Sequence, residues 1–253
     1  MRIKFLTVLF SFLSATCGFA AETGVSGTKG ADALDAKLQA IIPIAALTAN
    51  GDIARLKPAL GAGLDAGLSV NEIKEILVQL YAYAGFPRSL NAIHAFMGVM
   101  HEREAKGIKD TVGKEATPLP KDMDKDAYGA KVRRELAGVS EDPPAQGYQL
   151  FTPVIDVYLK EHLFADIFAR DVLDRREREL ATVSALAALS GTEGQLKFHI
   201  SAAMHTGLDV LQMRALITVL AARVGRREAR SVQTVLSEIL QAQRGTDEKM
   251  VGG

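Results

Sequence analysis

The chain has 253 residues, of which 48% are hydrophobic and 24% are charged, and its 30 basic residues balance its 30 acidic residues. This composition excludes a disordered chain and offers no basic excess for a nucleic-acid partner. Ala, Leu, Glu and Arg are abundant, and no run of alternating apolar and polar residues is long enough for a strand. We therefore predict an all-α fold.

The N-terminal segment, from Met1 to Ala20, has the pattern of a secretory signal peptide. Arg2 and Lys4 precede an apolar run, and small residues lead to Ala20, after which we expect cleavage. A membrane anchor is the alternative, but the run is short and contains Ser and Thr. A lipoprotein at Cys17 fits the preceding residues poorly. Because cleavage removes the only cysteine, we expect an exported, periplasmic protein without disulfides, thiolate ligands or a cysteine nucleophile.

The rest of the chain divides into two helical blocks. We expect a leader at residues 21–33, a first block at 34–113, a linker at 114–149, a second block at 150–245 and a tail at 246–253. One constant shift, which we call the repeat offset, aligns Leu56-Lys57 with Leu196-Lys197, Gly67-Leu68 with Gly207-Leu208, Leu80 with Leu220, and Gly85 with Gly225. The alignment indicates a tandem duplication.

Both blocks contain the same signal for a helix start. Ser69-x-x-Glu72 and Asp209-x-x-Gln212 are typical of capping boxes. Behind them, one helical face carries Ile73, Ile76, Leu77, Leu80 and Tyr81 in the first block, and Met213, Leu216, Ile217, Leu220 and Ala221 in the second. Each block should form a helical hairpin whose apolar stripe covers that of the other.

A break interrupts the helical pattern of the first block. Within YAYAGFPRSL, Gly85 frees the backbone from the usual steric limits and Pro87 supplies no N–H group. The equivalent turn of the second block, residues 223–227, keeps only the glycine, Gly225. The two blocks therefore differ at this turn.

Three segments in combination resemble the carboxymuconolactone decarboxylase family. They are Tyr83–Pro87 followed by Asn91-Ala92, Tyr128–Arg134, and Leu173–Leu180 running on to His199 and Gly207. This family shares an all-helical fold with alkylhydroperoxidase D (AhpD). About residues 128–240 look like a whole unit and about residues 34–107 like a second copy.

The peroxidase branch of this superfamily uses Cys-x-x-Cys followed by a histidine. In the second block those positions are Thr192, Gln195 and His199. Both cysteines are replaced, and the corresponding first-block residues include no histidine. A dithiol peroxidase or disulfide reductase is therefore untenable.

His199 is the central candidate for chemistry. Its helical neighbours Leu196 and Ile200 are apolar, so it should point inward. From the residues alone, a core histidine with one hydrogen bond is a sufficient explanation. The resemblance instead implies a pocket histidine that donates a proton.

Two glutamates open the preceding helix, where the helix dipole also favours acidic residues. The family's Arg-Arg-Glu-Arg pattern selects Glu177 as the catalytic partner of His199. Glu179 stays open as the alternative, because one extra residue near Ser190 leaves the helical phase unsettled.

The resemblance also implies a set of substrate-binding residues. Guanidinium groups suit a carboxylated substrate, although a run of charges is usually a solvated face. The expected set is Tyr83, Phe86, Tyr128, Arg133, Arg134, Arg175 and Arg176.

No cofactor or metal is expected. The remaining histidines lack metal-ligand spacing, and the sequence contains no P-loop, dinucleotide fingerprint or nucleophile elbow. The expected partners are a small carboxylate or lactone and further copies of the chain in a trimer-like ring, with no nucleic acid and no membrane after cleavage of the signal.

The resemblance implies a cofactor-free lyase. A carboxylated lactone would lose carbon dioxide into its own carbonyl, and His199 would return a proton to carbon. Because the Tyr-Ala-Gly-Phe-Pro turn lies in one block and the Glu and His in the other, we expect one composite pocket. The alternative is a binding or assembly protein without chemistry on the same scaffold.

Overall fold

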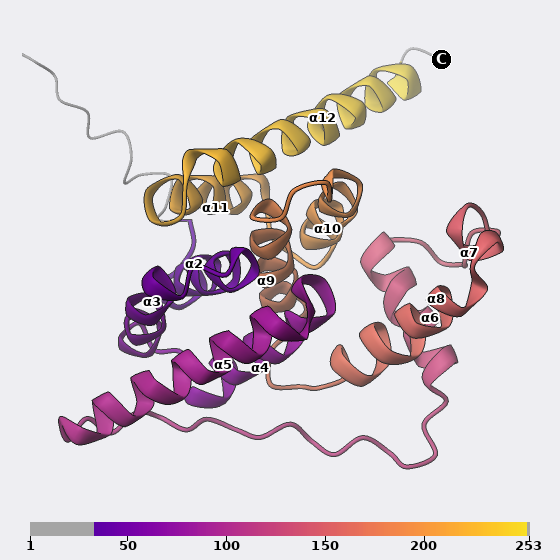
Figure 1. The fold of residues 1–253 in the computed structure, drawn as a ribbon. Helices are drawn as coiled ribbons and strands as arrows, with labels where there is room; N and C mark the ends of the chain where they lie inside the picture. The colour runs from indigo at the N-terminus through magenta and orange to yellow at the C-terminus, as the bar shows by residue number, and fades with distance from the viewer. Residues whose placement is uncertain (1–32, 252–253) are drawn as a thin grey trace, which may run out of the picture.

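The computed structural model describes residues 33–251, and every regular element in that range is a helix (Figure 1). The prediction of an all-α fold is confirmed. The expected signal peptide lies outside the described residues, as does the leader up to residue 32. Within the described range, no helix is both long and apolar enough to cross a membrane.

Four helices of the first block recur in the second. The first set is α2 (Ala36–Asn50), α3 (Ile53–Asp65), α4 (Val70–Gln79) and α5 (Tyr81–Ala105). The second set is α9 (Arg175–Ala187), α10 (Glu193–His205), α11 (Val210–Arg223) and α12 (Arg226–Val251). The repeat offset carries both ends of α3 onto the two ends of α10. The shift found in the sequence therefore also relates the helices, and α12 extends through most of the expected tail.

Side-chain caps fix where these helices begin. The Ser69 hydroxyl accepts a hydrogen bond from the N–H of Glu72, whose carboxylate accepts one from the N–H of Ser69. Asp209 and Gln212 form the same reciprocal pair. Both predicted capping boxes are confirmed, and each satisfies N–H groups that a first helical turn leaves unpaired.

The predicted helical break lies inside α5. Gly85 has φ 81° and ψ 158°, a conformation that residues with a Cβ rarely adopt. Its counterpart Gly225 has no positive φ; instead, a Cβ there would come within 2.4 Å of a carboxylate oxygen of Glu228. The two blocks share the break but not its backbone geometry.

The segment expected to be a linker contains a further helix, α6 (Lys125–Ala137), which Asp124 caps. The chain then forms the short helices α7 (Tyr148–Phe151) and α8 (Pro153–Val157) and the π-helix η1 (Tyr158–Ile167). This π-helix packs against α6. A Cβ on Gly129 would lie 2.0 Å from the carbonyl oxygen of Lys160, so a glycine permits the close contact. We call this pair the α6–η1 hairpin.

Between α5 and α6 the chain runs without helix along the outside of the first block (Figure 1). The N–H groups of Val70 and Asn71 donate to the carbonyls of Thr111 and Val112. Further along, the N–H and the hydroxyl of Thr117 both donate to Asp171, just before α9. These bonds fasten the connecting segment to both blocks.

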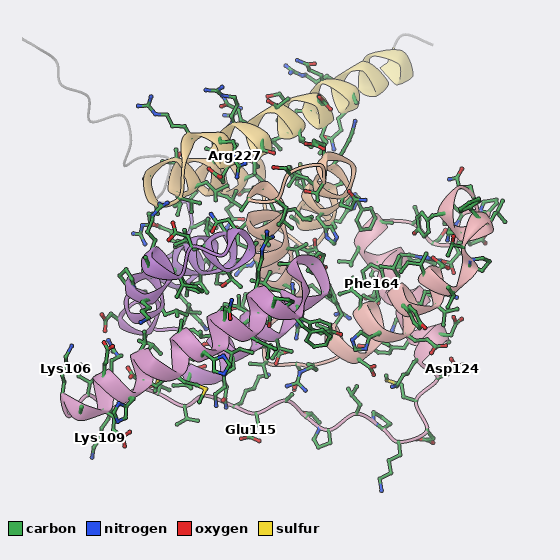
Figure 2. The ribbon with its side chains drawn as sticks, in the orientation of Figure 1. Lys106, Lys109, Glu115, Asp124, Phe164 and Arg227 are labelled. Atoms are coloured by element: carbon green, nitrogen blue, oxygen red, sulfur yellow. The ribbon has the colours of Figure 1, made fainter. Side chains whose placement is uncertain are left out.

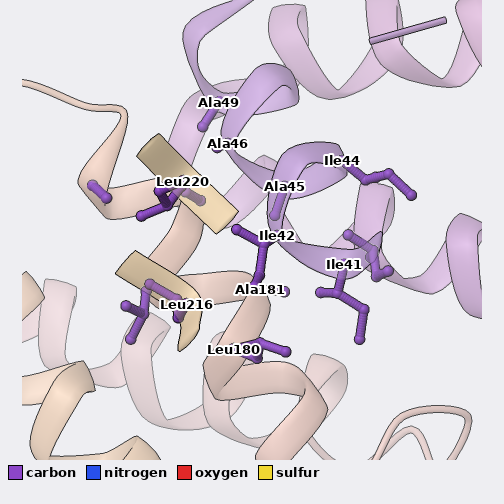
Figure 3. Packing of buried hydrophobic residues seen from close by; sticks show 14 of the residues in the cluster. Ile41, Ile42, Ile44, Ala45, Ala46, Ala49, Leu180, Ala181, Leu216 and Leu220 are labelled. Carbon is purple, nitrogen blue, oxygen red and sulfur yellow. The ribbon is translucent and has the colours of Figure 1, made fainter. Parts of the chain in front are cut away.

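The core lies where the two sets of helices meet, with α2 and α9 packed together at its centre. Ile42 of α2 lies close to Ala181 of α9 and Leu216 of α11 (Figure 3), and all three are buried. One continuous apolar cluster joins both blocks. The two blocks therefore form one packed unit, which holds side chains of one block at fixed positions beside those of the other.

Candidate functional site

His199 and Glu179 form a buried pair between α10 and α9. Nδ1 of His199 lies 2.7 Å from Oε2 of Glu179. The exposed fraction is 5% for His199 and 0% for Glu179. A carboxylate accepts the Nδ1–H of an imidazole and thereby fixes its tautomer, which leaves Nε2 as the ring atom that can exchange a proton with a ligand.

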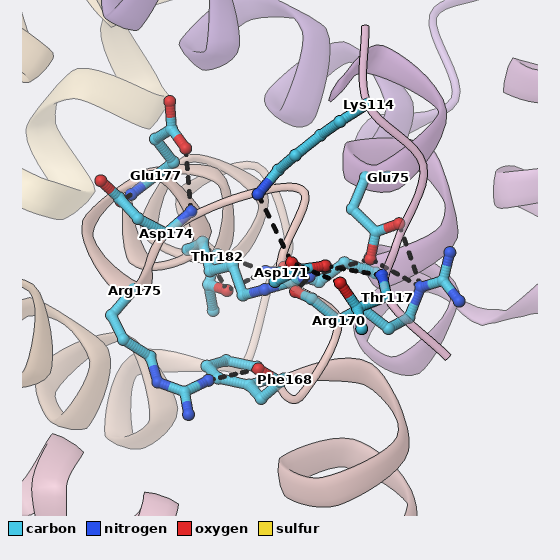
Figure 4. A network of polar contacts seen from close by, with 12 residues as sticks. Glu75, Lys114, Thr117, Phe168, Arg170, Asp171, Asp174, Arg175, Glu177 and Thr182 are labelled. Atoms are coloured by element: carbon cyan, nitrogen blue, oxygen red, sulfur yellow. Dashed lines mark hydrogen bonds and ion pairs between the residues drawn. The ribbon is translucent and has the colours of Figure 1, made fainter. Parts of the chain in front are cut away.

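Glu177 faces elsewhere, so its expected role as the partner of His199 is corrected to Glu179. The Glu177 carboxylate accepts the N–H of Asp174 at 2.9 Å and completes a third capping box (Figure 4). Burial raises the pKa of Glu177. Residues two positions apart in an α-helix are separated by about 200° around its axis, so the two glutamates point to opposite sides.

Tyr83, from the first block, lies against this pair. Its ring meets the imidazole of His199 edge-on, with the ring centres 5.6 Å apart. The hydroxyl is buried near the side chain of Thr182 and makes no hydrogen bond of normal geometry within the described part of the chain. Burial, together with the nearby carboxylate of Glu179, raises the pKa of Tyr83 well above its usual value, so the phenol stays protonated and can donate a hydrogen bond.

Unpaired polar atoms gather at this point. Within the described part of the chain, four buried side-chain atoms lack a hydrogen-bond partner, and three belong to neighbours in this group: Oη of Tyr83, Nε of Arg178 and Oε1 of Glu179. Such groups are rare in folded proteins because each costs about 1–3 kcal/mol. Their concentration makes this group the candidate functional site.

A buried polar network continues from this site across the two blocks. Arg178 donates to Glu75 at 2.8 Å and to Gln79 at 2.7 Å, and Gln79 donates to Thr182 at 2.8 Å. Glu75, Gln79 and Tyr83 follow one another at four-residue steps along one side of the first block. Arg170 also binds Glu75 (Figure 4). The network joins α4 of the first block to α9 of the second, beside the positions of Tyr83 and Glu179.

The α6–η1 hairpin covers the site with apolar side chains. Its buried residues pack on Ala202 of α10, and Tyr83 and Phe198 pack against the same cluster. Phe164 of η1 lies between the hairpin and the rest of the protein (Figure 2). Phe198 also meets the His199 ring edge-on, with the centres 5.1 Å apart. The imidazole therefore lies in an aromatic, water-poor environment.

One family model matches the chain twice, over residues 18–97 and 157–237, and its description is the carboxymuconolactone decarboxylase family. The chain belongs to the carboxymuconolactone decarboxylase family. The last residues of the two matches, 97 and 237, are related by the repeat offset that also relates α3 to α10. No curated protein matches the chain significantly.

Four arginines were expected to bind the carboxylates of a substrate. Three of them instead bind groups of the protein itself. Arg133 pairs with Asp156 at 2.8 Å, and Arg134 pairs with Asp142. Arg175 donates to the carbonyl oxygen of Phe168 (Figure 4) and lies 3.5 Å from the hydroxyl of Tyr128. Arg176 makes no hydrogen bond or ion pair within the described part of the chain. None of the four touches His199 in this arrangement.

Phe86 also lies away from the site. Its side chain is 63% exposed and stacks on Tyr81 at a ring distance of 4.5 Å. Of the seven residues expected to bind substrate, Tyr83 alone contacts the histidine. For Phe86 the reason is the kink at Gly85, which separates its direction from that of Tyr83.

A cavity of about 350 Å³ lies beside α6. Arg133, Arg134 and Asp142 lie in its wall together with Phe198, whose ring also contacts His199. Two of the expected arginines thus line a cavity that shares Phe198 with the site, although His199, Glu179 and Tyr83 do not line it.

The next question is whether histidine and acidic side chains form a metal site. Among the described side chains, those of residues 33–245, no three His, Cys, Asp or Glu are grouped so that they could hold a metal ion. His162 contacts Asp166, and His205 contacts the carbonyl of Leu136. Each of these two histidines thus has a partner within the protein.

Proposed function

We propose that the protein is a cofactor-free lyase that decarboxylates a small carboxylated lactone or a related acid by proton transfer through His199 and Glu179. The observation that carries the proposal is the buried Nδ1–Oε2 contact of 2.7 Å beside the unpaired hydroxyl of Tyr83. A family match alone would not select these three residues.

Each residue has a role that follows from its surroundings. Glu179 accepts Nδ1–H and stabilises the imidazolium, so that Nε2 of His199 can deliver a proton to the carbon that loses carbon dioxide. Tyr83 donates a hydrogen bond to the oxygen on which negative charge develops as the bond breaks. The apolar cover of the α6–η1 hairpin keeps water out and strengthens these interactions.

The substrate would enter through the cavity beside α6. Arg133 and Arg134 would attract its carboxylates at the approach, exchanging protein carboxylates for those of the substrate. Phe198 separates that cavity from the imidazole, so its side chain must move during each turnover.

The test uses the purified full chain with muconolactone carboxylates and follows the release of carbon dioxide. We expect turnover by the wild type and a loss of about 100-fold or more in His199→Ala, as is typical when a general acid is removed. Release of carbon dioxide that is equally fast in His199→Ala would exclude the proposed mechanism.

A binding or assembly protein is the second candidate, favoured by the engagement of the expected arginine clamp with Asp142 and Asp156. The same experiment separates the two functions. A ligand that is retained unchanged supports the binding role. If the protein is inactive toward this lactone, other lactones and keto acids are tested in the same way.

A further inference from the structure

The repeat offset locates an equivalent of the His199 site in the other half of the molecule. The counterpart of His199 is Ala59 on α3. The counterpart of Tyr83 is Arg223, at the end of α11. Both counterparts line a single cavity of about 470 Å³ between α2, α3 and α11. The twin of the candidate catalytic site is therefore a pocket, not a packed interface.

The difference in side chains explains the space. Ala59 replaces an imidazole by a methyl group. Ala202, which the α6–η1 hairpin covers in the second block, corresponds to Ala62, which lines the cavity. A volume of about 470 Å³ lies in the range of small-molecule sites. The cavity is therefore large enough for an organic ligand.

The walls of the cavity are mainly apolar. They come from Ala40, Pro43, Leu47, Ala54, Pro58, Ala59 and Ala62, and the polar groups come from Arg55 and Arg223. Such a lining favours a ligand with an apolar body and few polar atoms.

The two arginines have different roles. Arg55 donates from Nη2 to the carbonyl oxygens of Arg223 and Val224, both at 2.8 Å, and lies 3.6 Å from Asp52. Its position is fixed and its charge is largely balanced. The guanidinium of Arg223 makes no hydrogen bond or ion pair with the side chains that the structure describes, those of residues 33–245. One positive charge beside an apolar wall thus remains for an anion.

We propose that this cavity is a second ligand site, which binds a small organic monocarboxylate through Arg223 and encloses its apolar body. No acid–base pair is present, because Ala59 occupies the position of His199, and Ala40, which follows the N-cap Asp35 at the same distance as Glu179 follows Asp174, occupies that of Glu179. The site binds its ligand without chemistry. This function is additional to the proposed lyase activity and independent of it.

The test is calorimetric titration of the full chain with benzoate, and with benzamide as a neutral probe of similar shape. Arg223→Gln should weaken benzoate binding about tenfold or more and leave benzamide binding unchanged, because a charge-assisted hydrogen bond is lost. Ala59→Phe should abolish binding of both probes by filling the cavity. The matched control is Arg226→Gln, an exposed arginine outside the cavity, which should bind as the wild type does.

Equal benzoate affinity in the wild type and in Arg223→Gln would overturn the proposal, as would the absence of benzoate binding to the wild type. Thermal unfolding checks that Ala59→Phe is folded; if it is not, Arg223→Gln decides, because its side chain is exposed. Failure here is distinguishable from failure of the lyase proposal, since carbon dioxide release depends on His199 and is measured separately.

Discussion

Glu179 contacts Nδ1 of His199 at 2.7 Å, while Glu177, two positions earlier in the same helix, binds the backbone N–H of Asp174. The pair gives a matched comparison. Glu179→Gln should lower the rate of decarboxylation about 10–100-fold, because the partner that orients the imidazole is changed. Glu177→Gln should leave it unchanged, since glutamine also completes a capping box. The rate of carbon dioxide release checks both. An equal loss in the two variants would contradict the assignment of Glu179.

The tautomer of His199 offers a readout that is independent of substrate. With Glu179 as acceptor, the proton of a neutral imidazole should reside on Nδ1. The ¹⁵N chemical shifts of the ring report which nitrogen carries it. We expect the Nδ1–H form in the wild type and in Glu177→Gln, and a mixed population in Glu179→Gln. The same shifts in all three proteins would count against the pairing.

Tyr83→Phe should separate stability from activity. Its buried hydroxyl has no partner in the described part of the chain, so its removal should leave the free energy of unfolding unchanged or raise it by about 1 kcal/mol. The rate of decarboxylation should fall about 100-fold, because a donor to the developing charge is lost. Urea unfolding and carbon dioxide release measure the two effects. A clear loss of stability would show that the hydroxyl has a structural role.

The buried ion pair between Glu75 and Arg178 should dominate the stability of the contact between blocks. The two side chains are 3% and 0% exposed. Glu75→Gln should cost about 3–5 kcal/mol, because it leaves the Arg178 charge buried without its partner. Glu72→Gln is the matched control: it keeps the capping box and loses only the pair with Lys37 near the surface, worth about 1 kcal/mol or less. Similar losses in urea unfolding of the two variants would contradict the role of the network.

The raised pKa of Glu177 predicts a pH dependence. Burial raises it above the ordinary value of 4.5, so the protonated carboxyl is the form that the fold favours. Its contribution to stability is fully present below pH 4.5 and is lost as the pH rises through the folded-state pKa. Compared with Glu177→Gln, the wild type should therefore lose melting temperature as the pH increases. A difference in melting temperature between the two proteins that stays constant with pH, or that shifts in favour of the wild type as the pH rises, would disprove this.

The repeated features of the fold could be predicted from the sequence because their causes are local. Ser69 and Glu72 are close neighbours in the chain, and the caps at Asp209 and Gln212 follow the same rule. The break at Gly85 was also visible, because glycine and proline act on the backbone next to them.

The residues that complete the site could not be found this way. Glu75 and Arg178 are 103 residues apart, and each resembles a solvated charge on its own helix. Choosing between Glu177 and Glu179 required the phase of α9, which the sequence left open. The partners of Arg133 and Arg134 could not be predicted either, because Asp142 and Asp156 are brought to them by the fold of the region between the two sets of repeated helices.

The repeat offset has a consequence for the number of site imidazoles in each chain. In a duplicated chain with two intact halves, reagents that modify the imidazole would be taken up twice per polypeptide. Here the equivalent of His199 is Ala59, so the stoichiometry is set by covalent structure at one such imidazole per chain. On the proposed function, one label at His199 per chain should therefore abolish the activity, and however many copies assemble, each would contribute a single centre.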